Sequence, residues 1–461
     1  MLLLLATLLQ DSVTPQLRPF VRVAATTVAL TNVRVIDGTG APAKTGQTLV
    51  ISQGKISAVG DAASTQPPAR ATVLDLAGRT VMPGYVMVHE HMYYPSGGGT
   101  YPWHGFSFPR LYLAGGATTI RTAGNMQGYA DLGLKQNIEA GMLPGPDIDV
   151  TAPYLNGPGL PIAQVKALRG VEDATKMVEY WAGEGATSYK AYMQISRAEL
   201  GAAVAAAHAR KLKVTGHLCS VTYREAADLG IDNLEHGFLA STDFVANKQP
   251  DRCPPSANQS LIDVDLNGAP FQDLVKHLIA KGVALTSTLT VFETFTPGRP
   301  RAPDKVLDAM IPEARDQYLR QFSLIAGNMR SPYAKLFPKA MAMELAFAKA
   351  GGLLVAGTDP TGYGGVVAGY SNQRAIELLV EAGFTPLEAI RIGTLNGATY
   401  LGRQDRIGSI AAGKQADLIV VNGDPTTRIA DVEKVEIVFK RGIGYDSEKI
   451  FAAVKGVVGQ R

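Results

Sequence analysis

Eight short β-rich runs alternate with longer helical stretches between residues 83 and 395, and this alternation constrains the fold more than any other feature of the chain. The runs are GYVMVH, ATTIRTAG, DIDVTAP, TSYKAYM, KVTGHL, NLEHGF, VALTSTL and LLVAGTD. Stretches rich in Ala, Leu, Glu and Lys, such as SRAELGAAVAAAHARK, separate them and favour helices. Repeated β–α units predict a parallel sheet covered by helices, and eight units predict an α/β protein with a (β/α)₈ TIM-like barrel over residues 83–395.

The two ends of the chain share a different, strand-rich pattern. Residues 26–82 contain short alternating runs, two of which flank Gln53 and Gly54 as in a β-hairpin. Strands return over residues 396–461, in GSIAAGKQADLIVVNGD and VEKVEIVFKRG. Because neither segment alone is long enough for a good core, we expect both to form one small composite β-sandwich beside the barrel.

The composition is that of an ordinary globular protein and excludes several classes. The chain of 461 residues is 46% apolar and carries a net charge of +3. It has no basic run of the kind that binds nucleic acid or an anionic membrane, so we expect neither as a partner. Cys219 and Cys253 are too few for a disulfide framework, and without a C-x-x-C pair the chain has no cysteine-based zinc site.

Residues 1–25 form a distinct N-terminal segment. MLLLLATLLQ resembles the apolar core of a secretory signal peptide, and VRVAA downstream offers small residues for cleavage. No Lys or Arg precedes the apolar run, which is also far shorter than the roughly 20 residues that span a bilayer. Because of the apolar run and the small residues after it, we expect export to the periplasm or the medium. An irregular N-terminus on a cytoplasmic protein is the alternative.

The run VMPGYVMVHEH ends in two histidines separated by one residue. In a strand, successive side chains point to opposite faces, so His89 and His91 should face one way and Glu90 the other. Two neighbouring imidazoles at a strand end can hold one metal ion. Alone, the pattern fits equally well with two polar residues where a strand meets a loop.

Four further polar side chains occur at or near the ends of separate β-rich runs. These are Lys190 in TSYKAYM, His217 in VTGHL, His236 in NLEHG and Asp359 in VAGTDP. Each one alone could be a hydrogen-bonded loop residue or part of a turn. Because a barrel brings the carboxyl ends of its strands together, their joint placement predicts one metal site at that end.

These motifs, together with the C-terminal GSIAAGKQADLIVVNGDP, resemble those of the amidohydrolase superfamily. The chain is more closely similar to its imidazolonepropionase-like and prolidase-like members, over nearly all of residues 28–442. The resemblance implies a metal-dependent hydrolase with a (β/α)₈ barrel and a composite β-sandwich. It also implies two divalent ions, with zinc expected and manganese or cobalt as alternatives.

The resemblance assigns a ligand to each motif. His89, His91 and Asp359 would bind the more buried ion, and His217 and His236 the second. Lys190 would bridge both ions as a lysine carboxylated by CO₂, because a free amine is protonated at neutral pH and repels cations. A salt-bridging, uncarboxylated Lys190 is the alternative, and it would leave a mononuclear site.

The implied mechanism is hydrolysis of a C–N bond. The ions would lower the pKa of a bridging water, and Asp359 would take its proton and pass it to the leaving nitrogen. Deaminases of the superfamily usually carry a Glu three residues after the strand-five His, where this chain has Ser220. We therefore expect a dipeptidase or an N-acyl amino acid hydrolase. A cyclic amide hydrolase, a mononuclear deaminase and a catalytically dead scaffold are the alternatives.

Several side chains near the predicted ligands are candidates for substrate contact. A Tyr or Arg there could bind a substrate carboxylate or stabilise an oxyanion, although packing at the barrel mouth explains each equally well. The candidates are Tyr94, His104, Arg121, Tyr192 and Tyr223. We also expect glycine-rich loops near the metal, at residues 97–99 and in TGYGGVVAG. The expected partner is a small amide or dipeptide, and a homo-oligomer is an open alternative to a monomer.

Overall fold

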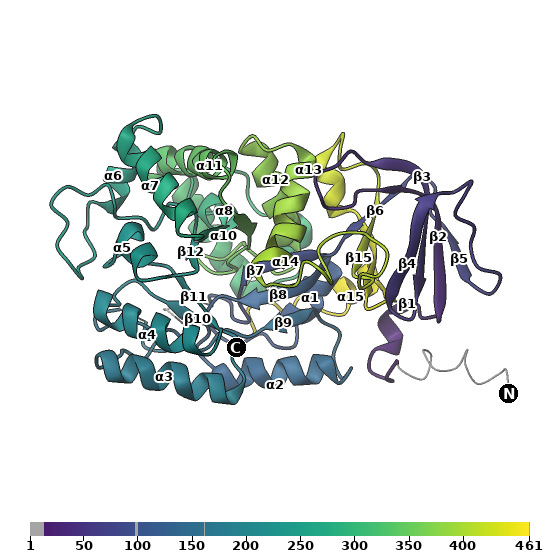
Figure 1. Ribbon diagram of the computed structural model, residues 1–461, viewed down its shortest axis with the longest axis horizontal. Helices are drawn as coiled ribbons and strands as arrows, with labels where there is room; N and C mark the ends of the chain where they lie inside the picture. Colours follow the sequence, from purple (N-terminus) through teal and green to yellow (C-terminus); the bar gives the residue numbers. More distant parts are fainter. Residues whose placement is uncertain (1–12, 97–99, 161, 461) are drawn as a thin grey trace.

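The computed structural model describes residues 13–96, 100–160 and 162–460, which fold into an α/β part and a second, all-strand part (Figure 1). The α/β part contains two parallel sheets with helices around them, and the second part is a sheet of nine strands. Residues 1–12 of the expected signal segment and residues 97–99 of an expected loop lie outside the described residues.

All eight predicted β-rich runs contain a strand. In chain order they are β7 (Tyr85–Glu90), β8 (Ala117–Thr122), β9 (Asp147–Asp149), β10 (Ser188–Ala191), β11 (Lys213–Gly216), β12 (Asn233–Glu235), β13 (Ala284–Ser287) and β14 (Leu354–Ala356). Strands β7 to β9 form a three-stranded sheet and β10 to β14 a five-stranded sheet. Every pair of neighbours in both sheets is parallel, as expected for repeated β–α units.

The two parallel sheets meet at both of their edges through isolated contacts. Next to β9 and β10, two isolated parallel bridges pair Thr151 with Ser188 and Leu155 with Ala191. Beyond β14 and β7, the backbone N–H of Thr358 donates to the carbonyl of His89 at 3.0 Å. The α/β architecture is thus as predicted, whereas a closed eight-stranded barrel stays a prediction because regular ladders do not bridge these two edges in the described chain.

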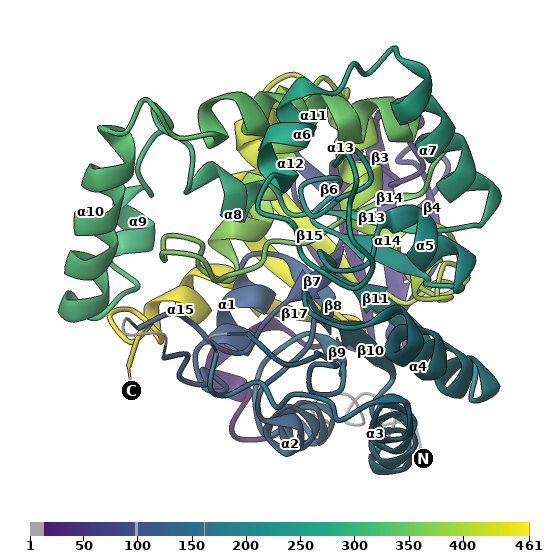
Figure 2. The same ribbon diagram turned by 90° about the vertical axis from the view of Figure 1, so that its left-hand side faces the viewer.

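Helices surround the parallel strands (Figure 2). They are α1 (Phe108–Ala114), α2 (Gly128–Glu139), α3 (Val171–Glu184), α4 (Arg197–Ala209), α5 (Tyr223–Asp228), α6 (Ala257–Asp263), α7 (Ala269–Ala280), α8 (Leu289–Glu293), α9 (Asp304–Leu307), α10 (Pro312–Ala326), α11 (Tyr333–Lys349), α12 (Tyr370–Glu381), α13 (Pro386–Arg391), α14 (Gly397–Tyr400) and α15 (Ser447–Ala452). Capping boxes with Ser or Thr followed by Glu three residues later fix the starts of α4, α5 and α13. Shorter turns are η1 (Arg18–Phe20), the π-helical η2 (Ile392–Asn396) and η3 (Ile429–Glu433).

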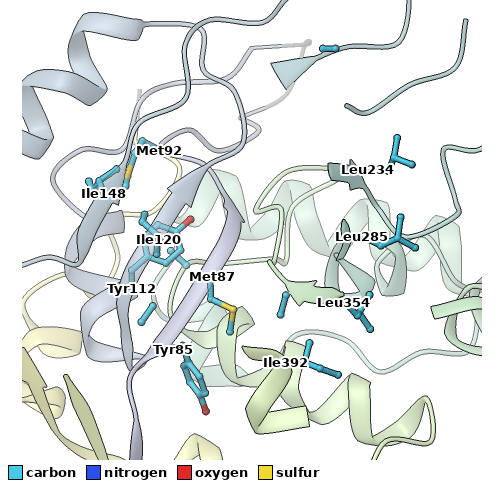
Figure 3. Close-up of a cluster of buried hydrophobic side chains, with 14 of the residues drawn as sticks. Tyr85, Met87, Met92, Tyr112, Ile120, Ile148, Leu234, Leu285, Leu354 and Ile392 are labelled. Atoms are coloured by element: carbon cyan, nitrogen blue, oxygen red, sulfur yellow. The ribbon is translucent and has the colours of Figure 1, made fainter. Parts of the chain in front are cut away.

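The main hydrophobic core lies between the parallel strands and these helices (Figure 3). Tyr85 and Met87 of β7 and Ile120 of β8 are fully buried on one side of it. Leu285 and Leu354 occupy the same core from β13 and β14. Burying apolar surface on this scale is the main source of stability for the fold and holds the strand ends in fixed positions.

The nine-stranded sheet combines strands from both ends of the chain. From the N-terminal side come β1 (Val21–Val23), β2 (Thr27–Val35), β3 (Lys44–Ser52), β4 (Lys55–Asp61), β5 (Thr72–Asp75) and β6 (Arg79–Pro83). The other three are β15 (Leu418–Asn422), β16 (Val435–Lys440) and β17 (Ile443–Asp446). Strand β15 lies antiparallel between β6 and β16, so neither end completes the sheet alone.

The hairpin predicted in the N-terminal segment is present between β3 and β4. Gln53 and Gly54 form its turn. Both have positive φ, at 51° and 77°, as the two central residues of a type I′ hairpin turn require. The exact domain limits, 26–82 with 396–461 and 83–395, and the sandwich form of the smaller part stay predictions. In the described chain, no helix combines the length and apolarity needed to cross a membrane.

Candidate metal centre

A cluster of potential metal ligands lies where β7, β12 and β14 end. The ligand atoms of His89, His236 and Asp359 all lie within 4.8 Å of one another. The Asp359 carboxylate is central, with Oδ1 3.3 Å from His91 Nε2 and Oδ2 3.7 Å from His89 Nε2. His236 Nδ1 is 3.8 Å from the same Oδ2. Three imidazoles therefore surround one carboxylate.

The remaining two predicted ligands adjoin this cluster. The ring of His217 lies 4.3 Å from that of His236, centroid to centroid. The Lys190 amine is buried and lies 3.6 Å from a carboxylate oxygen of Glu235. All six predicted ligands line the same pocket. The structure thus brings together the side chains that the sequence motifs pointed to, and their role as ligands stays a prediction.

The backbone at the strand ends is what turns these side chains toward one another. His236 and Asp359 have φ values of 69° and 52°, in the left-handed region that residues other than glycine seldom occupy. Such local strain is typical of functional sites. On β7, His89 and His91 face the pocket, whereas Glu90 points away and accepts a hydrogen bond from the Asn372 amide at 2.9 Å, as the alternation predicts.

Glu235 is a functional candidate that the sequence analysis missed. It is fully buried beneath the cluster, where its Oε2 accepts a 2.6 Å hydrogen bond from His89 Nδ1. Its Oε1 is 3.2 Å from the Arg121 guanidinium and also faces Lys190. Because His89 is held through Nδ1, its Nε2 is left directed at Asp359. The sequence feature that could have identified Glu235 is its position as an acidic residue inside an apolar strand, directly before His236.

The orientation of His91 is fixed in the same way. Its Nδ1–H donates to the backbone carbonyl of Gly124 at 3.1 Å, and a carbonyl can only accept. In its neutral form the imidazole therefore keeps its lone pair on Nε2, the atom nearest Asp359. An imidazole oriented by an outer hydrogen bond is characteristic of metal-binding histidines.

Burial sets the protonation of the cluster. It lowers the pKa of His89 to about 4 and that of His217 to about 3, and the nearby Lys190 charge adds to both effects. These imidazoles are neutral at pH 7 and can offer a lone pair. Burial alone would raise the pKa of Asp359, but the histidines around it outweigh burial and hold that pKa well below its ordinary value. Asp359 is therefore a carboxylate.

A pocket of about 430 Å³ opens above the cluster. Beyond the predicted ligands, its wall is largely aromatic and aliphatic. The aromatic side chains in the wall are Tyr93, Tyr101, Tyr154, Tyr192, Phe292, Phe295 and Tyr333. A concave apolar cavity with a few convergent polar groups is the usual form of a small-molecule site.

Four of the five side chains predicted to contact substrate are absent from the wall of this pocket. Arg121 is engaged by Glu235 and by hydroxyls of neighbouring strands. The hydroxyls of Tyr94 and Tyr223 bind backbone groups, and His104 stacks on an adjacent ring. Their side chains thus serve packing and internal hydrogen bonding, and a role for them in substrate contact stays a prediction. Tyr192 alone of the five lines the pocket.

The two cysteines form a disulfide that the sequence analysis did not anticipate. Cys219 lies two residues after His217 and lines the pocket, and Cys253 lies in the long connection between β12 and α6. The bond fastens this connection to the end of β11. Ser220 follows directly, and it is buried with its hydroxyl donating to the Ile195 carbonyl.

The described residues form an α/β protein with a buried cluster of histidines and one aspartate at the strand ends. Residues 80–444 match the model of the Amidohydrolase family, and the chain belongs to this family. The predicted resemblance is thereby confirmed.

Solved structures share the fold over nearly the whole chain. The bottromycin amidohydrolase is 22% identical, with a TM-score of 0.71 over 96% of this chain and 94% of its own. A Xaa-Pro dipeptidase with bound methionine in the active site is 20% identical, with a TM-score of 0.69 over 91% and 100%. A prolidase complexed with N-methylphosphonate-L-proline is 22% identical, with a TM-score of 0.67 over the same shares. At these identities the likeness concerns the fold.

Curated relatives match over short stretches. Adenine deaminase 1 of Jannaschia sp. (strain CCS1) is 38% identical over 69 residues, which are 15% of this chain and 11% of the relative. Imidazolonepropionase of Phocaeicola vulgatus is 60% identical over 40 residues, 9% of this chain and 10% of the relative. The chain thus spans only about a tenth of the length of these relatives where it matches them.

Proposed function

We propose that this protein is a metal-dependent hydrolase that cleaves a C–N bond of a small amide substrate. The observation that carries the proposal is the Asp359 carboxylate among three buried imidazoles, at the floor of a pocket of about 430 Å³. Membership of the Amidohydrolase family supports the same chemistry. A catalytically dead scaffold would have no reason to keep all six predicted ligands around one pocket.

The donor set fits two divalent ions, and we propose zinc, with manganese or cobalt as alternatives. His89, His91 and Asp359 would hold one ion, and His217 and His236 the other. Lys190 would join them as a carbamate. Burial lowers the pKa of Lys190 to about 8, so part of its amine is neutral near pH 7 and able to add CO₂. When bound, such ions supply a hydroxide nucleophile near neutral pH and polarise the substrate carbonyl.

Within this reaction, Asp359 is the residue proposed to move the proton. As a carboxylate at the pocket floor, it can accept a proton from the attacking water and deliver it to the leaving nitrogen. Glu235 keeps His89 oriented from below and takes no part in proton transfer, because it does not line the pocket.

For the substrate, the sequence motifs favour a dipeptide or an N-acyl amino acid. Two structural relatives are a Xaa-Pro dipeptidase and a prolidase, which supports a peptide-like amide bond. A cyclic amide is the alternative suggested by the matched imidazolonepropionase. Deamination is disfavoured because Ser220 stands where deaminases carry an acid and is turned away from the pocket toward Ile195.

We also propose how the molecule is organised and where it works. Strands β7 to β14 would close into one barrel over residues 83–395, with residues 26–82 and 396–461 forming a β-sandwich beside it. The disulfide supports a periplasmic or secreted protein, because such bonds persist in oxidising compartments. A homo-oligomer remains an alternative to a monomer, and light scattering on the purified protein decides between them.

The decisive experiment combines metal analysis with an amide panel. We expect two ions per chain and hydrolysis of at least one amide that a chelator abolishes. Lys190→Ala should lose at least one ion and about 10²-fold or more in kcat/KM, with partial rescue by a short added carboxylate. Lys213→Ala, on the adjacent strand β11 and outside the pocket, is the matched control. Full activity of Lys190→Ala without an added carboxylate would refute the bridging role.

A further inference from the structure

The pocket carries charged side chains only at its metal-binding floor. Among the described residues that line it, Lys190 and Asp359 are the only lysine and acidic side chains, and arginine is absent. Apart from the four histidines, the rest of the wall is aliphatic, aromatic or uncharged polar. A substrate carboxylate held against this wall would lose its water without gaining a counterion, which is strongly unfavourable.

Arginines on nearby elements are already committed to other partners. Arg299 and Arg374 each place Nη2 within 2.8 Å of Glu293 Oε1. Glu293 directly follows the wall residue Phe292. Redirecting either arginine toward a ligand would break an ion pair that is largely shielded from water. Neither is therefore available to bind a substrate carboxylate.

Aromatic rings reach the floor from two sides. On one side, Tyr93 stacks on His91 with centroids 4.4 Å apart, and Tyr192 lies 4.9 Å from His217. On the other side, the Phe292 ring lies edge-on to His236 at 5.6 Å. Both faces are therefore aromatic and uncharged within one ring of the candidate metal ligands, where the scissile bond of a substrate would lie.

The second aromatic face continues outward from Phe292. Phe295 and Tyr333 stack with centroids 5.2 Å apart, and Phe292 lies 6.1 Å from the same Tyr333 ring. Planar faces of this kind attract rings and apolar groups and offer no counterion to a carboxylate. The wall thus continues the uncharged surface away from the floor.

We propose that the substrate is a peptide-like amide without a free α-carboxylate, with an apolar or aromatic group on each side of the scissile bond. The inference rests on the proposed hydrolase function and revises the substrate class that the sequence motifs favour. It excludes free dipeptides and N-acyl amino acids in favour of their end-blocked forms or of simple aryl amides.

A matched pair of substrates tests the inference. N-benzoyl-phenylalaninamide and N-benzoyl-phenylalanine share the scissile benzamide bond and differ only in the terminal charge. With the zinc-loaded full chain and benzoate release as readout, we expect kcat/KM to be at least about tenfold higher for the amide. Equal or faster release from the acid would overturn the inference while leaving the proposed hydrolase function intact.

A second experiment adds a positively charged side chain to the pocket wall and asks whether the acid then binds more tightly. Asn258 is exposed and lines the pocket, so Asn258→Arg places a positive charge in the wall, and Asn258→Gln controls for the longer side chain. Calorimetric titration of both ligands into the metal-stripped chain needs no turnover. We expect Asn258→Arg to tighten binding of the acid at least about fivefold relative to the amide. An acid affinity unchanged by the arginine, or no binding of either ligand, would contradict the assignment.

Arg252 tests whether an arginine already present near the pocket acts as the counterion of a substrate carboxylate. It is exposed and directly precedes Cys253, whose disulfide partner lines the pocket. Arg252→Ala should leave the ratio of kcat/KM for the two substrates unchanged. A selective loss with the acid would show that this arginine serves as the counterion, and the inference would fail.

Discussion

Glu235 contacts three groups of the site from below, and we expect its negative charge to matter more than the volume of its side chain. Its carboxylate orients His89 and faces both Lys190 and Arg121. We expect Glu235→Gln to lower zinc affinity about 10- to 100-fold, because an amide orients the imidazole less strongly and leaves the buried Arg121 guanidinium without its anion. Titration against a competing chelator measures the affinity. Glu172→Gln, at an exposed position, is the control, and equal affinities in the two variants would refute the role.

Glu344 on α11 is buried, and burial raises the pKa of its carboxyl to about 8. The ordinary value is 4.5, so between pH 4.5 and 8 the folded state holds a proton that the unfolded state has released. Stability must therefore fall as pH rises through this window, by about 1.4 kcal/mol per pH unit. We expect Glu344→Gln to remove this dependence and to unfold at higher urea than the parent at pH 8. Parallel stability curves from pH 5 to pH 8 would contradict the assignment.

The candidate ligands could be found from the sequence, but their neighbours could not. His89 and Asp359 stand at ends of apolar runs, and parallel strands bring such ends together. Arg121 occupies a similar run and was predicted to contact substrate, yet its guanidinium turns inward to Glu235. The direction of an interior side chain depends on its partners across the strands, and one sequence does not contain that information.

At the scale of elements, local signals fixed the helices and turns, whereas long-range connections stayed hidden. The starts of α4 and α5 follow from capping boxes such as Thr222 with Glu225, and the β3–β4 hairpin follows from Gln53 and Gly54. The disulfide joins residues 34 positions apart, and neither cysteine shows a local pattern that marks the pairing. Capping boxes and hairpin turns can be predicted from sequence because the residues that form them lie within a few positions of one another.

The disulfide between Cys219 and Cys253 gives an element-scale prediction. It fastens the connection between β12 and α6 beside His217, and it closes a loop of 34 residues. We expect Cys253→Ser to lower the free energy of unfolding by about 2–4 kcal/mol and to raise KM more than it lowers kcat, because the pocket wall loosens. Urea unfolding and steady-state kinetics measure the two effects.

The double variant Cys219→Ser with Cys253→Ser separates the bond from the thiols. It should behave like the single variant, and the parent treated with a reductant should approach both. If reduction leaves both stability and KM unchanged, the disulfide does not support the pocket.

At the scale of the whole molecule, the two ends of the chain complete one sheet. Val420 of β15 pairs with Val81 of β6 across more than 300 residues of sequence. The sequence predicted that both ends would associate, because neither could bury a core alone. Which strands pair, and whether the barrel edges close fully, depends on registers between segments that carry no mutual signal in a single sequence.

A buried ion pair joins this sheet to the parallel strands. Lys440, at the end of β16, bonds to Asp147 at the start of β9, and Arg441 lies 2.8 Å from the same oxygen. Burial would raise the pKa of Asp147, but these cations outweigh it and lower the pKa below the ordinary 3.8. The pair therefore contributes stability above about pH 4, and this contribution is lost as the pH falls and Asp147 is protonated.

Removing both partners of this pair should cost less stability than the sum of the two single removals. Asp147→Asn leaves the Lys440 amine buried without its carboxylate, and we expect a loss of about 2–3 kcal/mol, somewhat less than for a fully buried pair because Arg441 is half-exposed. Lys440→Met should cost a similar amount. The double variant should cost less than the sum, since neither charge is then left unpaired. Urea unfolding of the four proteins at pH 7 gives the coupling energy, and simple additivity would show that the pair does not link the two parts of the molecule.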